Sequence, residues 1–103
     1  MDEKELIIFK IISAVGTARS MYIEAIQLAK TGDFEGAENL ISEGEKAFVE
    51  GHHAHVELIQ KEANGEKTDV SLILIHAEDQ LMSAEGFKII AEELIDVYKN
   101  MKK

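Results

Sequence analysis

The sequence predicts an all-α fold, a single antiparallel up-down-up three-helix bundle over residues 1–103, and three observations carry this prediction. The chain has no proline and is rich in alanine, leucine, isoleucine, glutamate and lysine, which favour or tolerate helices. Apolar residues recur mostly at three- and four-residue spacing, and no segment alternates with the period of a strand. Two glycine-containing breaks divide the chain, and short connections make successive helices antiparallel.

The first helix is expected at residues 3–31 and the second at residues 33–63. The Thr31-Gly32-Asp33 break separates them, and Asp33 or Thr31 can cap the second helix. The expected apolar positions of the first helix are Leu6, Phe9, Ile12 or Ser13, Gly16, Met21, Ile23, Ile26 and Leu28. The second helix carries one broad apolar stripe from Phe34 through Ile41, Phe48 and Leu58.

The third helix is expected at residues 69–101. Asn64-Gly65 marks the preceding turn, and Thr68 or Asp69 can cap the helix. A glycine inside an expected helix costs roughly 1 kcal/mol relative to alanine. Close approach of neighbouring helices is the expected compensation at Gly16, Gly44, Gly51 and Gly86.

The composition limits the cellular setting and the partners. A formal charge of −9 argues against nucleic acid and anionic membranes, which attract basic surfaces. It is compatible with a partner protein that carries a basic patch, and equally with a surface that only keeps the protein soluble. The chain has no cysteine, no long uninterrupted apolar run and no basic leader, so we expect a cytoplasmic protein without direct membrane insertion.

His76 is the candidate catalytic residue, because this titratable ring follows an almost entirely apolar run, residues 70–75. A three-helix bundle buries about half of each helix circumference, so the surplus apolar surface at residues 70–77 predicts self-association. Asp79 and Gln80 share a helix face with His76, at i+3 and i+4. Asp79 could accept a hydrogen bond from the ring, bind a cation or meet its own copies across a symmetry axis. A purely structural histidine is the alternative.

His52, His53 and His55 form a second cluster, for which a zinc site and a partly exposed patch are the two interpretations. A di-iron site is disfavoured because only one Glu-x-x-His motif is present, at Glu50 and His53.

Five segments together resemble one known family over nearly the whole chain. They occur in the family's order and spacing, and the last is the most specific: residues 16–20 (GTARS), 32–34 (GDF), 47–52 (AFVEGH), 62–66 (EANGE) and 75–82 (IHAEDQLM). The chain therefore resembles the lactose/cellobiose-type IIA component of the bacterial phosphoenolpyruvate-dependent sugar phosphotransferase system.

The resemblance implies a homotrimer of three-helix bundles that relays a phosphoryl group. His76 would accept the group from the carrier HPr and pass it to a cysteine of a IIB component. Asp79 would meet its symmetry mates on the trimer axis around a structural divalent metal, one Mg²⁺ per trimer, although the identity of the metal stays open.

The sequence departs from the family pattern at four positions. Glu78 and Gln80 replace a usual glutamine and histidine, and His53 and His55 replace commoner small or amide residues. Glu78 would place a negative charge near the phosphoryl acceptor. Two alternatives therefore stay open, a non-transferring helical regulatory module and a histidine-rich metal-binding bundle. The sequence does not identify the sugar, because a IIA component never needs to touch it.

Overall fold

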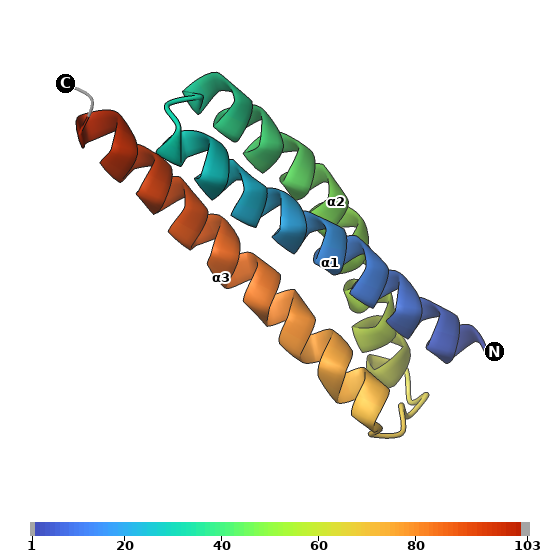
Figure 1. The fold of residues 1–103 in the computed structure, drawn as a ribbon. Helices are drawn as coiled ribbons and strands as arrows, with labels where there is room; N and C mark the ends of the chain where they lie inside the picture. Colours follow the sequence, from blue (N-terminus) through green and yellow to red (C-terminus); the bar gives the residue numbers. More distant parts are fainter. Residues whose placement is uncertain (1, 102–103) are drawn as a thin grey trace.

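The computed structural model describes residues 2–101, which form three long antiparallel helices (Figure 1). They are α1 (Glu3–Lys30), α2 (Phe34–Ala63) and α3 (Leu72–Met101), and they make a rod of 55 × 21 × 17 Å. No strand occurs within residues 2–101. The predicted all-α, up-down-up fold is confirmed.

The first two helices end in the same glycine-based turn. Gly32 and Gly65 have φ angles of 89° and 91°, a left-handed conformation that costs a glycine little. At each end, three backbone N–H groups that follow the helix donate back to carbonyls of its last turn, those of Leu28 and Ala29 in α1. Glycine in each break therefore stops the helix and reverses the chain.

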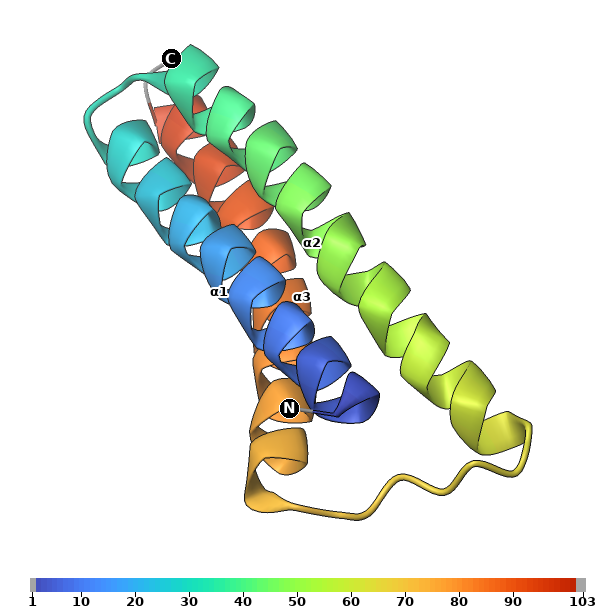
Figure 2. The ribbon, with the colours of Figure 1, turned by 90° about the vertical axis from the view of Figure 1, so that its right-hand side faces the viewer.

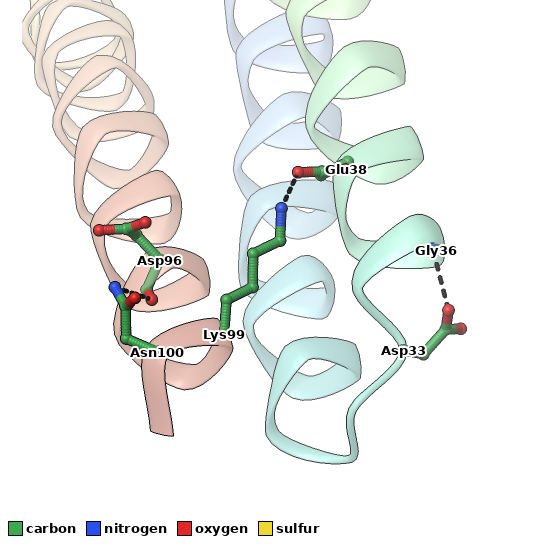
Figure 3. A network of polar contacts seen from close by, with 6 residues as sticks. All are labelled: Asp33, Gly36, Glu38, Asp96, Lys99 and Asn100. Carbon is green, nitrogen blue, oxygen red and sulfur yellow. Dashed lines mark hydrogen bonds and ion pairs between the residues drawn. The ribbon is translucent and has the colours of Figure 1, made fainter. Parts of the chain in front are cut away.

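The helix boundaries differ slightly from the predicted ranges of 3–31, 33–63 and 69–101. Asp33, rather than Thr31, caps α2, since its side chain accepts a hydrogen bond from the Gly36 N–H at 2.9 Å (Figure 3). The largest error is at α3, which begins at Leu72. Ser71 provides the first acceptors there, because its Oγ binds the Leu74 N–H and its carbonyl binds the Ile75 N–H. Neither Thr68 nor Asp69 acts as the predicted cap.

Helix α1 is the central element, and both other helices pack along it (Figures 1 and 2). Its buried residues belong to two core clusters, an isoleucine-rich one near the 64–71 loop and an alanine-rich one around Tyr22. By length and composition alone α1 could cross a membrane, and core helices of water-soluble proteins meet the same criteria. In this structure α1 forms the middle of the core.

The predicted apolar stripe of α1 was wrong in register. Leu6 and Phe9 are exposed, and the buried stripe consists of Ile7, Ile8, Ile11, Val15, Ala18, Tyr22, Ala25 and Ala29. The spacing of large apolar residues predicts a different stripe from the one that the alanines form. A helix packed on two sides accepts small residues because they let its neighbours approach closely.

Among Gly16, Gly44, Gly51 and Gly86, two glycines mark close approaches. A Cβ on Gly44 would lie 2.6 Å from Cε1 of Tyr22, and a Cβ on Gly51 would lie 2.7 Å from Cγ1 of Val15. These two glycines let α2 lie against α1, as predicted. A Cβ on Gly16 or Gly86 would meet nothing within 4 Å, so the prediction fails for these two within one chain.

Candidate functional site

His76 lies on the first turns of α3, and its side chain is exposed. The helix begins four residues earlier at Leu72, so His76 sits close to the end of the rod that carries the 64–71 loop (Figure 2). The next residue, Ala77, is 1 % exposed and anchors this turn in the core. The backbone of His76 is therefore held by packing while its ring remains accessible to another molecule.

Exposed apolar side chains surround the site along the chain. Val70 and Leu72 are 80 % and 85 % exposed, and Ile73 and Ile75 are also exposed. A soluble protein rarely leaves such a contiguous group uncovered unless it marks an interface. The single bundle therefore leaves the surplus apolar surface of residues 70–77 uncovered, which is the basis of the predicted self-association.

Asp79 is exposed on the side of α3 that faces away from the other two helices, and Gln80 is half-buried. Ile75 and Met82, which flank Asp79 on that side, are 48 % and 61 % exposed. Among residues 2–101, no hydrogen bond joins Asp79 to His76. The carboxylate is therefore placed on an apolar outer surface, where it is free to meet a cation or another molecule.

Glu78 points away from the side of α3 that carries His76. Two residues along a helix are about 200° apart, and Glu78 faces α2, where its Oε1 lies 2.7 Å from Nε2 of His55. The His55 side chain is only 16 % exposed. Two of the four departures from the family pattern, His55 and Glu78, thus contact each other. The carboxylate of Glu78 is engaged by the imidazole of His55 instead of facing the ring of His76.

The other two histidines of α2 are exposed. His52 stacks on Phe48 with ring centroids 6.4 Å apart. Within residues 2–101 there is no group of three or more histidine, aspartate or glutamate side chains that could hold a metal ion. The interpretation as a histidine-rich metal-binding bundle built from His52, His53 and His55 therefore has no geometric support in one chain.

Arg19 belongs to the GTARS segment, and the structure places it against α3. Its Nε donates to Oγ of Ser83 at 3.2 Å, and its guanidinium lies 4.7 Å from the ring centroid of Phe87. Ser83 follows His76 by two helical turns, so it lies on the same side of α3. The arginine in the GTARS segment was the available signal, and only the fold shows which part of α3 it contacts.

The comparisons with known proteins agree with one another. A profile of the family described as "PTS system, Lactose/Cellobiose specific IIA subunit" matches residues 6–99. The lichenan-specific phosphotransferase enzyme IIA component of Bacillus subtilis is 43 % identical over 100 residues, which cover 97 % of this chain and 91 % of that protein.

Two solved structures extend this agreement to the fold. The cellobiose-specific enzyme IIA from Bacillus anthracis superposes with a TM-score of 0.96 at 45 % identity, over 99 % of this chain and 94 % of the other. The IIA(Chitobiose) protein of Escherichia coli, solved in complex with HPr, gives a TM-score of 0.84 at 32 % identity over the full length of both chains. This chain belongs to the lactose/cellobiose-specific IIA family of the sugar phosphotransferase system.

Proposed function

We propose that this protein carries a phosphoryl group on His76 during uptake of a lactose/cellobiose-type sugar in the cytoplasm. The exposed imidazole of His76, on a backbone fixed by the buried Ala77, is the observation that carries the proposal. The donor is HPr, because the related IIA(Chitobiose) protein was solved in complex with HPr. We take the acceptor to be a cysteine thiolate of a IIB component, as the resemblance to the family implies.

The transfer needs no general base. The unprotonated nitrogen of His76 attacks phosphorus in line, a P–N bond forms, and the P–N bond of the donor phosphohistidine breaks with its electron pair returning to the donor nitrogen. We assign Nε2 as the attacking atom because Nδ1 lies nearer the helix backbone. The IIB thiolate then attacks phosphorus, the P–N bond at His76 breaks, and the imidazole is regenerated.

A reconstituted relay tests this assignment. We expect one phosphoryl group, measured by intact mass, after incubation with phosphoenolpyruvate, enzyme I and HPr. His76→Ala should abolish the mass gain, whereas the matched control His53→Ala, at an exposed histidine of α2, should keep it. Loss of phosphorylation in His53→Ala, or its retention in His76→Ala, would contradict the proposal.

We further propose a homotrimer that forms around the outer face of α3. This outer face is defined by exposed apolar residues at seven- and eight-residue spacing, namely Ile75, Met82, Ile90 and Val97. Gly86 lies among them with nothing near its Cβ position, so a second helix could approach the backbone there. The face runs along most of α3, which gives symmetric copies of α3 a continuous seam on which to pack.

Asp79 lies on this outer face, so symmetric copies of its carboxylate would come close together. Like charges at such a distance repel, and a hard cation such as Mg²⁺, which prefers oxygen ligands, would relieve the repulsion. The carboxylate chemistry fits such a metal, and Asp79 of each copy would hold it. When bound, the metal supplies positive charge to the seam and takes no part in phosphoryl transfer.

Replacing the Asp79 carboxylate tests whether the trimer can form without the metal. We expect Asp79→Leu to form a trimer that no longer responds to a chelator, because an apolar side chain removes the repulsion that the metal offsets. Light scattering coupled to size exclusion, with and without chelator, measures this. Dissociation of Asp79→Leu into monomers would contradict the metal's proposed role.

A further inference from the structure

A groove runs between α2 and α3, and α1 lies beneath it. Two cavities of about 380 and 340 Å³ make up the groove, and both are lined by Glu45 and Glu92. Two lysines of α3 reach across it, Lys88 to Glu45 at 3.3 Å and Lys99 to Glu38 (Figure 3). The apolar part of the second cavity consists of Phe48, Val49 and Ile89.

Tyr22 of α1 forms the floor of this groove. The residue is 0 % exposed, and its hydroxyl is buried with no hydrogen-bond partner in the described structure. Burial, together with the carboxylates of Glu45 and Glu92, raises the pKa of Tyr22 to about 12, so the phenol stays protonated. A buried polar group without a partner costs stability. The hydroxyl therefore points to a molecule that completes its hydrogen bonding.

The groove is strongly acidic. Five carboxylates line the two cavities, against two lysines and His52. The lysines pair with Glu38 and Glu45, which leaves three acids of α3 without a cationic partner within residues 2–101, namely Glu85, Glu92 and Asp96. An occupant must therefore carry positive charge and also tolerate the apolar wall.

We propose that the groove binds a linear aliphatic polyamine. One terminal ammonium donates to Glu92 and to the Tyr22 oxygen, the methylene chain lies along Phe48 and Ile89, and the other terminal ammonium meets Glu85. The site lies apart from His76, and its occupancy is independent of phosphoryl transfer.

The spacing of the two acids sets the length of the ligand. Glu85 and Glu92 are seven residues apart, which corresponds to two helical turns, or about 10 Å. An extended chain of single bonds advances about 3.5 Å for every three bonds, so about nine bonds separate two ammonium groups at this distance. Spermidine has this length, whereas putrescine is too short to reach both carboxylates.

Titration of the intact protein with spermidine, followed by backbone NMR, tests the site. We expect saturable binding with shifts confined to the groove, and weaker binding of putrescine. Glu92→Gln should weaken spermidine binding about tenfold or more, because it removes a charged hydrogen bond. Tyr22→Phe should weaken it by a smaller factor. The matched control is Glu24→Gln, which removes the same charge from an exposed position on α1 outside the groove.

Three results would overturn the proposal. In the first, Glu24→Gln weakens binding as much as Glu92→Gln, which would show a diffuse counterion atmosphere. In the second, Mg²⁺ at equal ionic strength displaces spermidine completely. In the third, the native assembly shows no shifts at groove residues. A variant's circular dichroism and thermal midpoint confirm that it is folded before binding is compared.

Discussion

Helices α1 and α3 are both long and apolar, yet they expose their apolar residues very differently. Eight residues of α1 are buried, and only two of its large apolar side chains, Leu6 and Phe9, are exposed. In α3 five residues are buried and eight large apolar side chains are exposed. Because both helices belong to one bundle, the difference shows that α1 serves the core of a single chain whereas α3 also carries surface suited to another molecule.

Both helices turn alanines inward, so the size of the inward residues alone does not explain the difference. In its second half α1 buries Ala18, Ala25 and Ala29, so α2 and α3 can both approach it. Helix α3 also turns alanines inward, at Ala77, Ala84 and Ala91, and it keeps many isoleucines and methionines outward. Apolar content alone therefore does not say whether a helix is central. The number of large apolar side chains that stay exposed does, two in α1 and eight in α3.

The sharpest test compares a buried isoleucine of α1 with an exposed isoleucine of α3. Ile11 of α1 is 1 % exposed, and Ile90 of α3 is 51 % exposed. We expect Ile11→Ala to lower the free energy of unfolding by about 2–5 kcal/mol through lost burial and a cavity. Ile90→Ala should instead reduce the dependence of the unfolding midpoint on protein concentration, because association stabilises the folded state by mass action. Urea unfolding at several protein concentrations measures both.

Equal effects of the two substitutions at all protein concentrations would remove the distinction between a core helix and an interface helix. The same result would weaken the proposed trimer, because Ile90 lies on the outer face of α3. A concentration-independent loss for Ile11→Ala alone would keep the core assignment and leave the seam without support.

Local chemistry explains why the number and direction of the helices could be predicted from the sequence. Gly32 and Gly65 stop two helices through backbone geometry that few other residues adopt, and Asp33 caps α2 through a side chain three residues from its donor. His76 could be proposed as the phosphoryl acceptor for a similar reason, since a polar ring after an apolar run is visible without a fold. Interactions between residues only a few positions apart can be inferred from consecutive residues of the sequence.

Interactions between helices could not be predicted in the same way. The register of α1 depends on which alanines face two neighbours, and large residues such as Leu6 and Phe9 mislead a reading based on apolar spacing. The contact of His55 with Glu78 joins residues 23 positions apart. Both depend on the relative rotation of two helices, which no single segment encodes.

The helix glycines give a second, smaller test of the same division. Gly44→Ala and Gly86→Ala each gain roughly 1 kcal/mol of helix propensity. A difference in stability between the two variants therefore reports packing. Gly44→Ala should destabilise the protein, by about 1–2 kcal/mol net, because its Cβ would lie 2.6 Å from the buried Tyr22 ring. Gly86→Ala should stabilise the separate subunit, since its Cβ would meet nothing within 4 Å. Thermal unfolding at low protein concentration compares the two, and stabilisation by both would refute the close approach at Gly44.

The smallest effect concerns the pair that joins α2 to α3 near the site. A double-mutant cycle of His55→Ala and Glu78→Ala should give a coupling energy of about 1 kcal/mol or less, because the Glu78 side chain is 40 % exposed. Neither substitution should abolish phosphorylation of His76, since Glu78 faces α2 and not the side of the acceptor ring. A large acceleration of phosphoryl transfer in Glu78→Gln, measured by rapid quench, would show instead that this carboxylate acts on the acceptor. Without such an acceleration, His55 and Glu78 form a matched contact between α2 and α3, and the surface proposed to meet HPr is unchanged.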